Sequence, residues 1–546
     1  MTTERTSSMA ARWVPPAILV GLSALLFAYL LARFPYNGFY GQDAYAYYYQ
    51  AEALWRGLTG QAEPAWAQFT ANGLYWPVGY HLHLLPGFLL GWPDMGRVVT
   101  LALSALTPAV LYLLVGEIWY AATARQRIAA GLVAGAVLVL TGTYTRTGLS
   151  LMSDVPAVFW GTLAIYCCLR AWPPVERAHV ERSRGLWALA AGLSLGVAVL
   201  VRYSSALLVP ALIAYLLARG YSKRQQVLSQ RGEHRRERWQ PALLWAALGL
   251  TIALLPQLAY ALTHEPGPAL RSWSLSNLFS TNVSGPDGSA TYTLPMLAFY
   301  LLSTLINVNG GFLSPLHLPA LALGAWALAR QRNLAALILI FVWWLIPVLA
   351  YSGTPYQTHR FALTFMPVLA LLAGVGASIG LSWLVQEVRN GVQQPDFGRA
   401  SMGGAAALTL LALGLGLAQG WRSVELWAAT HSAFNVQEQQ VVALAREAVA
   451  ASGREGAPRV VCFGFSAPLY HYTRWPILDF FAHDEADIRE FLAAPGPHIL
   501  VLPQENMSTQ WAGTPSGARW QWIQSTYKLT RQGQSGAFTV YVIGDD

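Results

Sequence analysis

Charged residues are scarce in this sequence. They make up 11% of the 546 residues, whereas a soluble globular chain carries about 25%. Hydrophobic residues make up 54%, and the mean hydropathy is +0.37. Most of the surface must therefore face something other than water, which excludes a single soluble enzyme, a disordered chain and a coiled coil. The 22 Trp, 25 Tyr and 20 Phe residues suit aromatic belts at two lipid interfaces, so we expect a polytopic membrane protein.

Cysteine and lysine are also rare. Three cysteines exclude a disulfide framework. Only Lys223 and Lys528 are lysines, so nearly all of the 35 basic residues are arginines. The sequence also has no Asp-x-Asp motif for a metal-bound nucleotide sugar and no glycine-rich dinucleotide fingerprint.

Eleven apolar runs are close to the length that spans about 30 Å of hydrocarbon. They cover 14–32, 98–116, 128–145, 154–170, 186–201, 203–219, 242–262, 313–329, 334–350, 361–384 and 404–420. Two shorter apolar segments, 78–91 and 294–308, predict helices that lie on the outer interface. The first run has no convincing cleavage site after it, so we expect an uncleaved anchor.

The arginines and lysines predict the orientation. With the N-terminus in the cytoplasm, the inner loops hold 19 of them and the short outer loops hold 7, as the positive-inside rule requires. This asymmetry accounts for the pI of about 9.3 without nucleic acid. We therefore expect a multi-pass plasma (inner) membrane protein whose C-terminal part lies outside the cytoplasm.

The last part of the chain has a different pattern. Helical periodicity in "NVQEQQVVALAREAVAAS" is followed by short buried runs, "RVVCFG", "HILVLP" and "AFTVYVIG", with a helix-like segment between the first two. We expect a transmembrane catalytic domain over 1–421 and a small extracytoplasmic α/β domain over 422–546.

Asp43 stands about ten residues beyond the first span, among tyrosines. It is either an N-cap, since Asp accepts N–H bonds there, or a general base that takes a proton from a hydroxyl. Ser153 or Asp154, followed by Pro156, marks the start of a span. Asp154 is either a cap or a second carboxylate of the site, and Arg146 precedes it as a candidate partner.

Arg202 interrupts an otherwise apolar helix, and a central arginine costs about 2.5–3.5 kcal/mol on insertion scales unless it is paired or hydrated. His359 and Arg360 stand at the outer start of another span. These side chains either reach toward the headgroups or form an outward-facing pocket for an anion. His81 and His83 point to different sides of a helix, so a metal pair is not expected there.

Five segments in order resemble the GT-C class of membrane glycosyltransferases, in the branch of protein O-mannosyltransferases and lipid A aminoarabinose transferases (glycosyltransferase family 39). They read "GQDAYAYYYQAEAL", "YWPVGYHLHLLP", "SLMSDVPAVFW", "GVAVLVRYSSALL" and "HRFALTFMPVLALLAG". The family usually has Asp-Glu in the first outer loop, where this chain has Asp43-Ala44. Some relatives have Lys where this chain has Trp76.

The resemblance implies an inverting transfer of a sugar from a polyprenyl-phosphate donor to an acceptor hydroxyl at the outer membrane face. Asp43 would be the base, with no cofactor or metal required. The expected donor and phosphate-binding residues are Arg202, His359, Arg360, Tyr75 and Arg146. The expected acceptor and sugar pocket consists of Tyr45, Tyr47, Trp76 and His81. An alternative for Tyr75, Trp76 and Tyr80 is anchoring at the membrane interface.

Two other functions remain open from the sequence. A transporter or flippase also needs spans and charges, but would place carboxylates near the bilayer midplane. A catalytically inactive GT-C-like scaffold would use its C-terminal domain to bind a partner. The sequence does not distinguish a protein, lipid or glycan acceptor.

Overall fold

The computed structural model describes most of the chain. The described residues are 9–61, 76–92, 95–174, 183–229, 240–262, 273–285, 288–303, 305, 311–331, 333–390 and 397–544.

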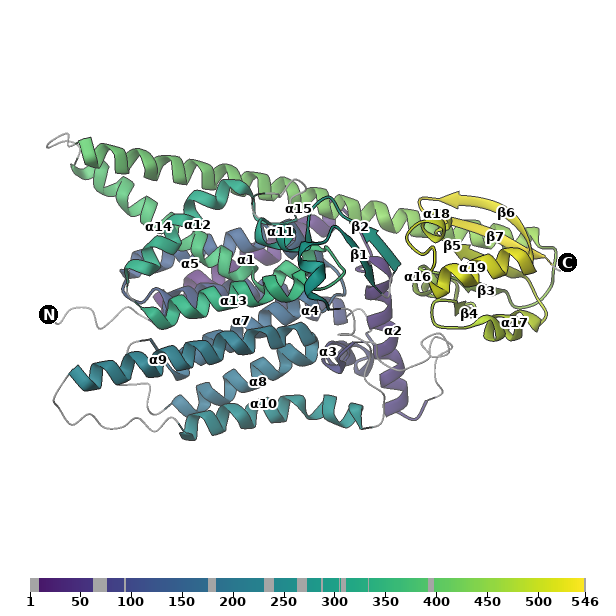
Figure 1. Cartoon of the computed structure of the whole chain (residues 1–546), viewed down its shortest axis with the longest axis horizontal. Coiled ribbons are helices and arrows are strands. Elements are labelled where there is room, and N and C mark those ends of the chain that lie inside the picture. Colours follow the sequence, from purple (N-terminus) through teal and green to yellow (C-terminus); the bar gives the residue numbers. More distant parts are fainter. Residues whose placement is uncertain are drawn as a thin grey trace.

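A helical bundle forms the first four-fifths of the molecule (Figure 1). Its α-helices are α1 (Met9–Arg33), α2 (Gly41–Leu58), α3 (Val78–Leu89), α4 (Met95–Ile118), α5 (Ala124–Val139), α6 (Gly142–Leu149), α7 (Asp154–Ala171), α8 (Arg184–Val201), α9 (Val209–Ser229), α10 (Gln240–Ala261), α11 (Met296–Leu301), α12 (Leu318–Arg330), α13 (Leu334–Ser352) and α14 (Met366–Asn390). Short 3-10 helices connect them: η2 (Tyr203–Leu208), η3 (Leu275–Phe279), η4 (Pro315–His317) and η5 (His359–Thr364).

Each of the eleven apolar segments predicted from the sequence coincides with a helix. In the described residues, 8 helices are long and apolar enough to cross a membrane, or 9 if α5 and α6, bent by 67° at their junction, form one span. The other two predicted segments are α7 and α12. Helix α7 carries Asp154 and Arg170 near its ends, and α12 has only 13 residues. Both pack inside the same bundle, α7 against α4 and α8 and α12 against α14.

Close helix crossings in the bundle depend on glycine. A Cβ atom at Gly192 of α8 would lie 1.9 Å from the carbonyl oxygen of Ala246 on α10. A Cβ at Gly376 of α14 would lie 1.9 Å from the carbonyl oxygen of Ala320 on α12. Small residues at such crossings allow the backbones to approach, which is how membrane helices pack without a hydrophobic driving force between them.

The C-terminal part forms a small α/β domain, as predicted. Its sheet has the strand order β4-β3-β5-β7-β6, from β3 (Arg459–Cys462), β4 (Ile477–Asp479), β5 (His498–Leu502), β6 (Lys528–Ser535) and β7 (Phe538–Gly544). Strand β3 pairs in parallel with β4 and β5, and β7 runs antiparallel to β5 and β6. The helices are α16 (Ser466–Thr473), α17 (Glu485–Ala493), α18 (Gln504–Ser508) and α19 (Pro515–Thr526). Strands β4 and β6 were not expected from the sequence.

Helix α15 (Phe397–Ala451) joins the bundle to this domain and runs along the length of the molecule (Figure 1). At 1.5 Å per residue the whole helix is about 80 Å long, whereas the hydrocarbon core of a membrane is roughly 30 Å thick. The helix is apolar at its start and polar at its end. We therefore take the apolar part up to Gly420 as the span and the part from Arg422 onward as a projection. This projection contacts β5, β6, β7 and α16. The predicted domain boundary at 421/422 falls inside α15, and the division into 1–421 and 422–546 stays a prediction.

Helices α2 and α3 and a hairpin lie at the end of the bundle that faces the C-terminal domain (Figure 1). The hairpin pairs β1 (Asn282–Gly285) with β2 (Gly288–Thr291) and reaches the C-terminal domain, where the Ser289 N–H donates to the Gln510 carbonyl at 3.0 Å. This end collects the segments that the sequence places in the outer loops.

Candidate active site

Asp43 lies in the first turn of α2 but does not cap it. The N-cap residue is Tyr40, which makes no side-chain capping bond. Asp43 Oδ2 instead accepts a hydrogen bond from Arg360 Nη1 at 2.9 Å. Its Oδ1 has no hydrogen-bond partner among the described residues, and 39% of the side chain is exposed. The carboxylate is thus held on one oxygen and accessible on the other.

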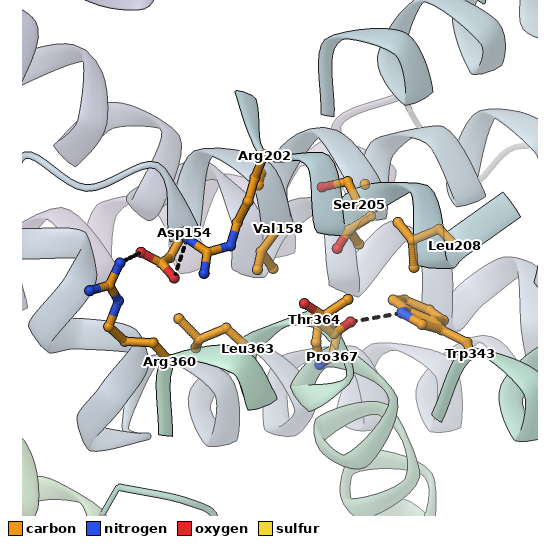
Figure 2. Close-up of a pocket in the computed structure, with 13 residues that line it drawn as sticks. Asp154, Val158, Arg202, Ser205, Leu208, Trp343, Arg360, Leu363, Thr364 and Pro367 are labelled. Atoms are coloured by element: carbon orange, nitrogen blue, oxygen red, sulfur yellow. Dashed lines mark hydrogen bonds and ion pairs between the residues drawn. The ribbon is translucent and has the colours of Figure 1, made fainter. Parts of the chain in front are cut away.

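Asp154 lies between two arginines (Figure 2). Arg202 Nη1 is 3.0 Å from Asp154 Oδ1, and Arg360 Nη2 is 3.3 Å from Asp154 Oδ2. Only 1% of the Asp154 side chain is exposed. A carboxylate buried to this extent is stable as an anion only when it is paired, and here two guanidinium groups pair it. Arg360 uses its two terminal nitrogens to join Asp154 to Asp43, which the planar fork of arginine permits.

Local breaks in the helices bring these side chains together. Arg202 has an extended backbone between the end of α8 and the start of η2, so it turns toward Asp154 at the start of α7. Arg360 lies in η5, whose first turn is capped by the Thr358 hydroxyl. The arginine that interrupts an apolar run in the sequence therefore marks a true break between two helices.

A pocket opens from these charges into the bundle. Asp154, Arg202 and Arg360 line its polar end, and its walls continue through Val158, Leu208 and other side chains (Figure 2). The further lining residues are Ala157, Gly161, Thr162, Ser205, Trp343, Leu363, Thr364 and Pro367. One end of the pocket is therefore charged, and the rest is largely apolar.

Arg146 does not pair with Asp154, contrary to the sequence-based expectation of a partner there. Its guanidinium carbon lies 4.6 Å from the Tyr40 ring centroid and 4.5 Å from that of Trp427. Asp154 pairs with Arg202 and Arg360 instead, because α8 and η5 place their arginines nearer.

His359 does not line the pocket with its neighbour Arg360. Its ring packs against Phe312, with centroids 4.6 Å apart, and against Phe299 at 5.5 Å. Burial, together with the charge of Arg146, lowers the pKa of His359 to about 4. The ring is therefore neutral at neutral pH.

The residues expected in the sugar and acceptor pocket have separate surroundings. The Tyr47 hydroxyl is 2.8 Å from Ser153 Oγ, and its ring lies 4.5 Å from the Trp76 ring. The Tyr45 hydroxyl points to the other side of α2 and donates to Glu438 at 2.7 Å. His81 is fully buried, with Nε2 3.0 Å from Gln50 Oε1. Tyr75 lies outside the described residues.

Sequence reasoning missed a stripe of side chains on α15. Trp427, His431, Asn435 and Glu438 recur at helical spacing. The last three face the N-terminal end of α2 and the loop before it, and Trp427 faces Arg146. The Asn435 amide donates to the Phe39 carbonyl at 3.2 Å and to Glu438 at 3.1 Å. The spacing of these polar residues was a signal that α15 packs against the site. Their assignment to a separate domain concealed it.

In the described part of the chain, no group of three or more His, Cys, Asp and Glu side chains is arranged to hold a metal ion. The expectation that no metal is required stays a prediction.

A family model gives the first comparison with known proteins. The model of the dolichyl-phosphate-mannose-protein mannosyltransferase family matches residues 95–268, the segment with Arg146, Asp154 and Arg202. No curated protein matches the sequence.

Solved structures give the second comparison. ArnT from Cupriavidus metallidurans is 14% identical, with a TM-score of 0.56 over 98% of both chains, in its apo state and bound to undecaprenyl phosphate. The oligosaccharyltransferase AglB from Archaeoglobus fulgidus, in complex with an inhibitory peptide and a dolichol-phosphate, is 12% identical, with a TM-score of 0.55. That match covers 99% of this chain and 75% of AglB. These likenesses confirm the GT-C fold predicted from the resemblance.

Proposed function

On the premise of a GT-C fold with a segment of the protein mannosyltransferase family, we propose that this membrane protein is an inverting glycosyltransferase. It moves a sugar from a polyprenyl-phosphate donor to an acceptor hydroxyl. The observation that carries the proposal is the placement of Asp43, through Arg360, at the charged end of a largely apolar pocket.

The pocket suits a lipid phosphate. The guanidinium groups of Arg202 and Arg360 can bond phosphate oxygens through their N–H groups, and the walls formed by Val158 and Leu208 can contact the prenyl chain. The ArnT and AglB structures that hold undecaprenyl phosphate and a dolichol-phosphate support this class of donor. His359 and Tyr75 were also expected at the phosphate. In our proposal His359 contributes through packing beside Arg360.

The transfer is a single displacement. The acceptor hydroxyl gives its proton to Asp43 Oδ1 while its oxygen forms a bond to the anomeric carbon. The bond between that carbon and the phosphate oxygen breaks, and its electron pair leaves with the polyprenyl phosphate. Attack opposite to the leaving group inverts the anomeric centre. A well-placed general base contributes roughly 10²–10⁴ in rate.

Arg360 and Asp154 position these groups. Arg360 fixes the Asp43 carboxylate through Oδ2 and leaves Oδ1 for the acceptor. Asp154 is the second carboxylate of the site, and because it is buried between two arginines its role is to hold them rather than to take a proton. Of the expected sugar pocket, Tyr47 contacts Ser153 next to Asp154, and Trp76 packs on Tyr47. Tyr45 and His81 instead hold α2 in place through Glu438 and Gln50.

The proposed reaction needs no metal and takes place outside the cytoplasm, at the end of the bundle that faces the C-terminal domain. The protein lies in the plasma membrane with its N-terminus in the cytoplasm, as the arginine distribution predicts. Its partners are membrane lipid, the lipid-linked sugar and an acceptor glycan, lipid or protein.

The test uses the full-length protein in lipid nanodiscs with a panel of radiolabelled polyprenyl-phosphate sugars. Asp43→Asn keeps the size of the side chain and removes the base, and we expect loss of polyprenyl phosphate release by at least about 100-fold. Glu52→Gln is the matched control, because Glu52 lies on the same helix and forms its ion pair with Arg56, away from Arg360 and Asp154. A chelator added to the wild type should change nothing.

Three results would contradict the proposal. Equal activity of Asp43→Asn and wild type would exclude Asp43 as the base. Movement of an intact lipid-linked sugar across the bilayer, followed with the protein in sealed liposomes, would indicate a flippase. Absence of binding to every donor would favour an inactive scaffold.

A further inference from the structure

Three arginines and two aspartates gather around the site, and one arginine has no acidic partner. Arg202 and Arg360 are each within 3.3 Å of an aspartate oxygen. The Arg146 side chain makes no hydrogen bond or ion pair with any described residue, although its charge acts on Arg360 and Asp154. Rings cover the guanidinium, Tyr40 at 4.6 Å and Trp427 at 4.5 Å, so its N–H edges are left for another ligand.

Two further nitrogen-bearing side chains beside Arg146 also lack partners. His431 is fully buried, its ring lies 4.0 Å from the Tyr40 ring, and neither ring nitrogen has a hydrogen-bond partner in the described structure. The buried indole nitrogen of Trp427 has none either. A buried polar group without a partner costs about 1–3 kcal/mol, so this concentration of unsatisfied nitrogens favours binding of a further group here.

The occupant must accept hydrogen bonds. Arginine and the indole N–H only donate, and a neutral imidazole has one N–H to donate. Burial, reinforced by the charge of Arg146, lowers the pKa of His431 to about 3, so the positive charge here belongs to Arg146 alone. An oxyanion fits this donor set, because hydrogen bonds from a guanidinium to a phosphate or carboxylate are the strong ones.

We propose that Arg146, His431 and Trp427 form an oxyanion subsite that binds a phosphate or carboxylate group of the acceptor. This rests on the proposed function, because it assigns the acceptor to the same site. The subsite is built by α6, α15 and the start of α2, whereas the donor pocket is lined from α7, η2, η5, α13 and α14. None of its residues lines the donor pocket. The acceptor hydroxyl would therefore be presented to Asp43 by a charged group a short distance away on the same molecule.

The binding test is independent of turnover. Full-length Asp43→Asn protein in a maltoside detergent is titrated with inorganic phosphate, and binding is followed by phosphorus NMR line broadening, with and without saturating undecaprenyl phosphate. We expect phosphate to bind in both conditions. Arg146→Gln should weaken this binding by about 10- to 100-fold, and Arg146→Lys should weaken it less because the charge remains.

Arg330→Gln is the matched control, since Arg330 also lies over a tryptophan ring, at 4.1 Å from Trp326, but belongs to α12. His431→Phe keeps the ring and removes both nitrogens, and should weaken phosphate binding several-fold. If Arg146→Gln does not fold, the phosphate affinity of Arg146→Lys is compared with that of the protein that keeps Arg146, and weaker binding by Arg146→Lys is the expected result.

Two results would overturn the inference. Loss of phosphate binding when undecaprenyl phosphate is added would mean that the anion belongs to the donor. Equal binding by wild-type Arg146 and Arg146→Gln proteins would mean that there is no such subsite. Neither result would alter the Asp43→Asn test, so the subsite and the proposed function can fail separately.

Discussion

Helix α2 lies between two buried carboxyl groups, one near each of its faces. One is paired with arginines and the other has only neutral hydrogen-bond donors. On one face, Asp43 and Tyr47 point toward the bundle, where Asp154 is paired with two arginines. On the other face, Tyr45 donates to Glu438, which also accepts from Asn435 and has no cationic partner among the described residues.

Burial is nearly complete for both carboxyl groups, so burial does not decide their charge. Asp154 is an anion because guanidinium groups replace the lost water. Burial raises the pKa of Glu438 to about 7, although the hydrogen bonds from Tyr45 and Asn435 oppose the rise. Helix α2 therefore joins a permanently charged site to a junction with α15 that titrates near neutral pH.

The largest expected effect is on the charged side. Asp154→Leu leaves Arg202 without its acidic partner and Arg360 with Asp43 as its acidic partner, and removing one member of a buried ionic group costs about 3–5 kcal/mol. Thermal unfolding in detergent should show the loss, and the double variant with Arg202→Leu should recover part of it. An unchanged unfolding temperature for Asp154→Leu would mean that water already solvates the arginines.

The next largest effect is a pH dependence of the free energy of unfolding that arises from Glu438. In the folded protein Glu438 binds its proton up to about pH 7, whereas in the unfolded chain it loses it near 4.5. Its contribution is thus fully present below about pH 4.5 and is lost as pH rises to 7. The loss is about 3 kcal/mol, at roughly 1.4 kcal/mol per pH unit.

Glu438→Gln stays neutral and should flatten this dependence. The measurement is the unfolding temperature of the wild type and of Glu438→Gln between about pH 5 and 8, the range in which Glu438 titrates in the folded protein. Parallel curves for the two proteins would show that Glu438 is ionised in the fold, like Asp154.

A smaller effect is expected from Arg360→Lys. The ammonium keeps the charge but cannot contact Asp43 and Asp154 together as the fork does. A misplaced Asp43 should lower kcat by about 100-fold, with the donor KM changed less. Arg56→Lys is the control on the surface of α2, and a normal kcat for Arg360→Lys would show that a single charge suffices.

The smallest effect is expected from Tyr45→Phe, which removes one hydrogen bond to Glu438. Such a bond contributes about 1 kcal/mol. Because this bond lowers the pKa of Glu438, its loss should also move the pH midpoint of unfolding upward. Tyr47→Phe removes the matching bond to Ser153 on the other face and should leave the midpoint in place.

Several features of the fold could be predicted from the sequence because they depend on local composition. Apolar length predicted the helices of the eleven long apolar segments and the shorter α3 and α11, and the short buried runs predicted β3, β5 and β7. Strand β6 escaped prediction because its exposed, polar pattern lacks a buried face, and β4 because it has only three residues.

The candidate site was predictable in part. Asp43, Asp154, Arg202 and Arg360 were singled out because charge at the edge of an apolar run must be paired or used. Their pairing was not predictable, and Arg146 was expected beside Asp154. The partners come from helices that are neighbours only in space: Arg360 is 317 residues from Asp43.

Hydropathy and periodicity are properties of the local chain, so they were enough to predict a membrane protein of many spans with a small α/β domain and a few charges at the edges of apolar runs. Which of these charges meet depends on how the helices pack. The break at Arg202, the turn at η5 and the length of α15 placed Asp154 between two arginines, Glu438 against Tyr45, and Arg146 between two rings with no acidic partner in the described structure. Each of these outcomes depends on distances between segments that are far apart in the chain, which no local pattern contains.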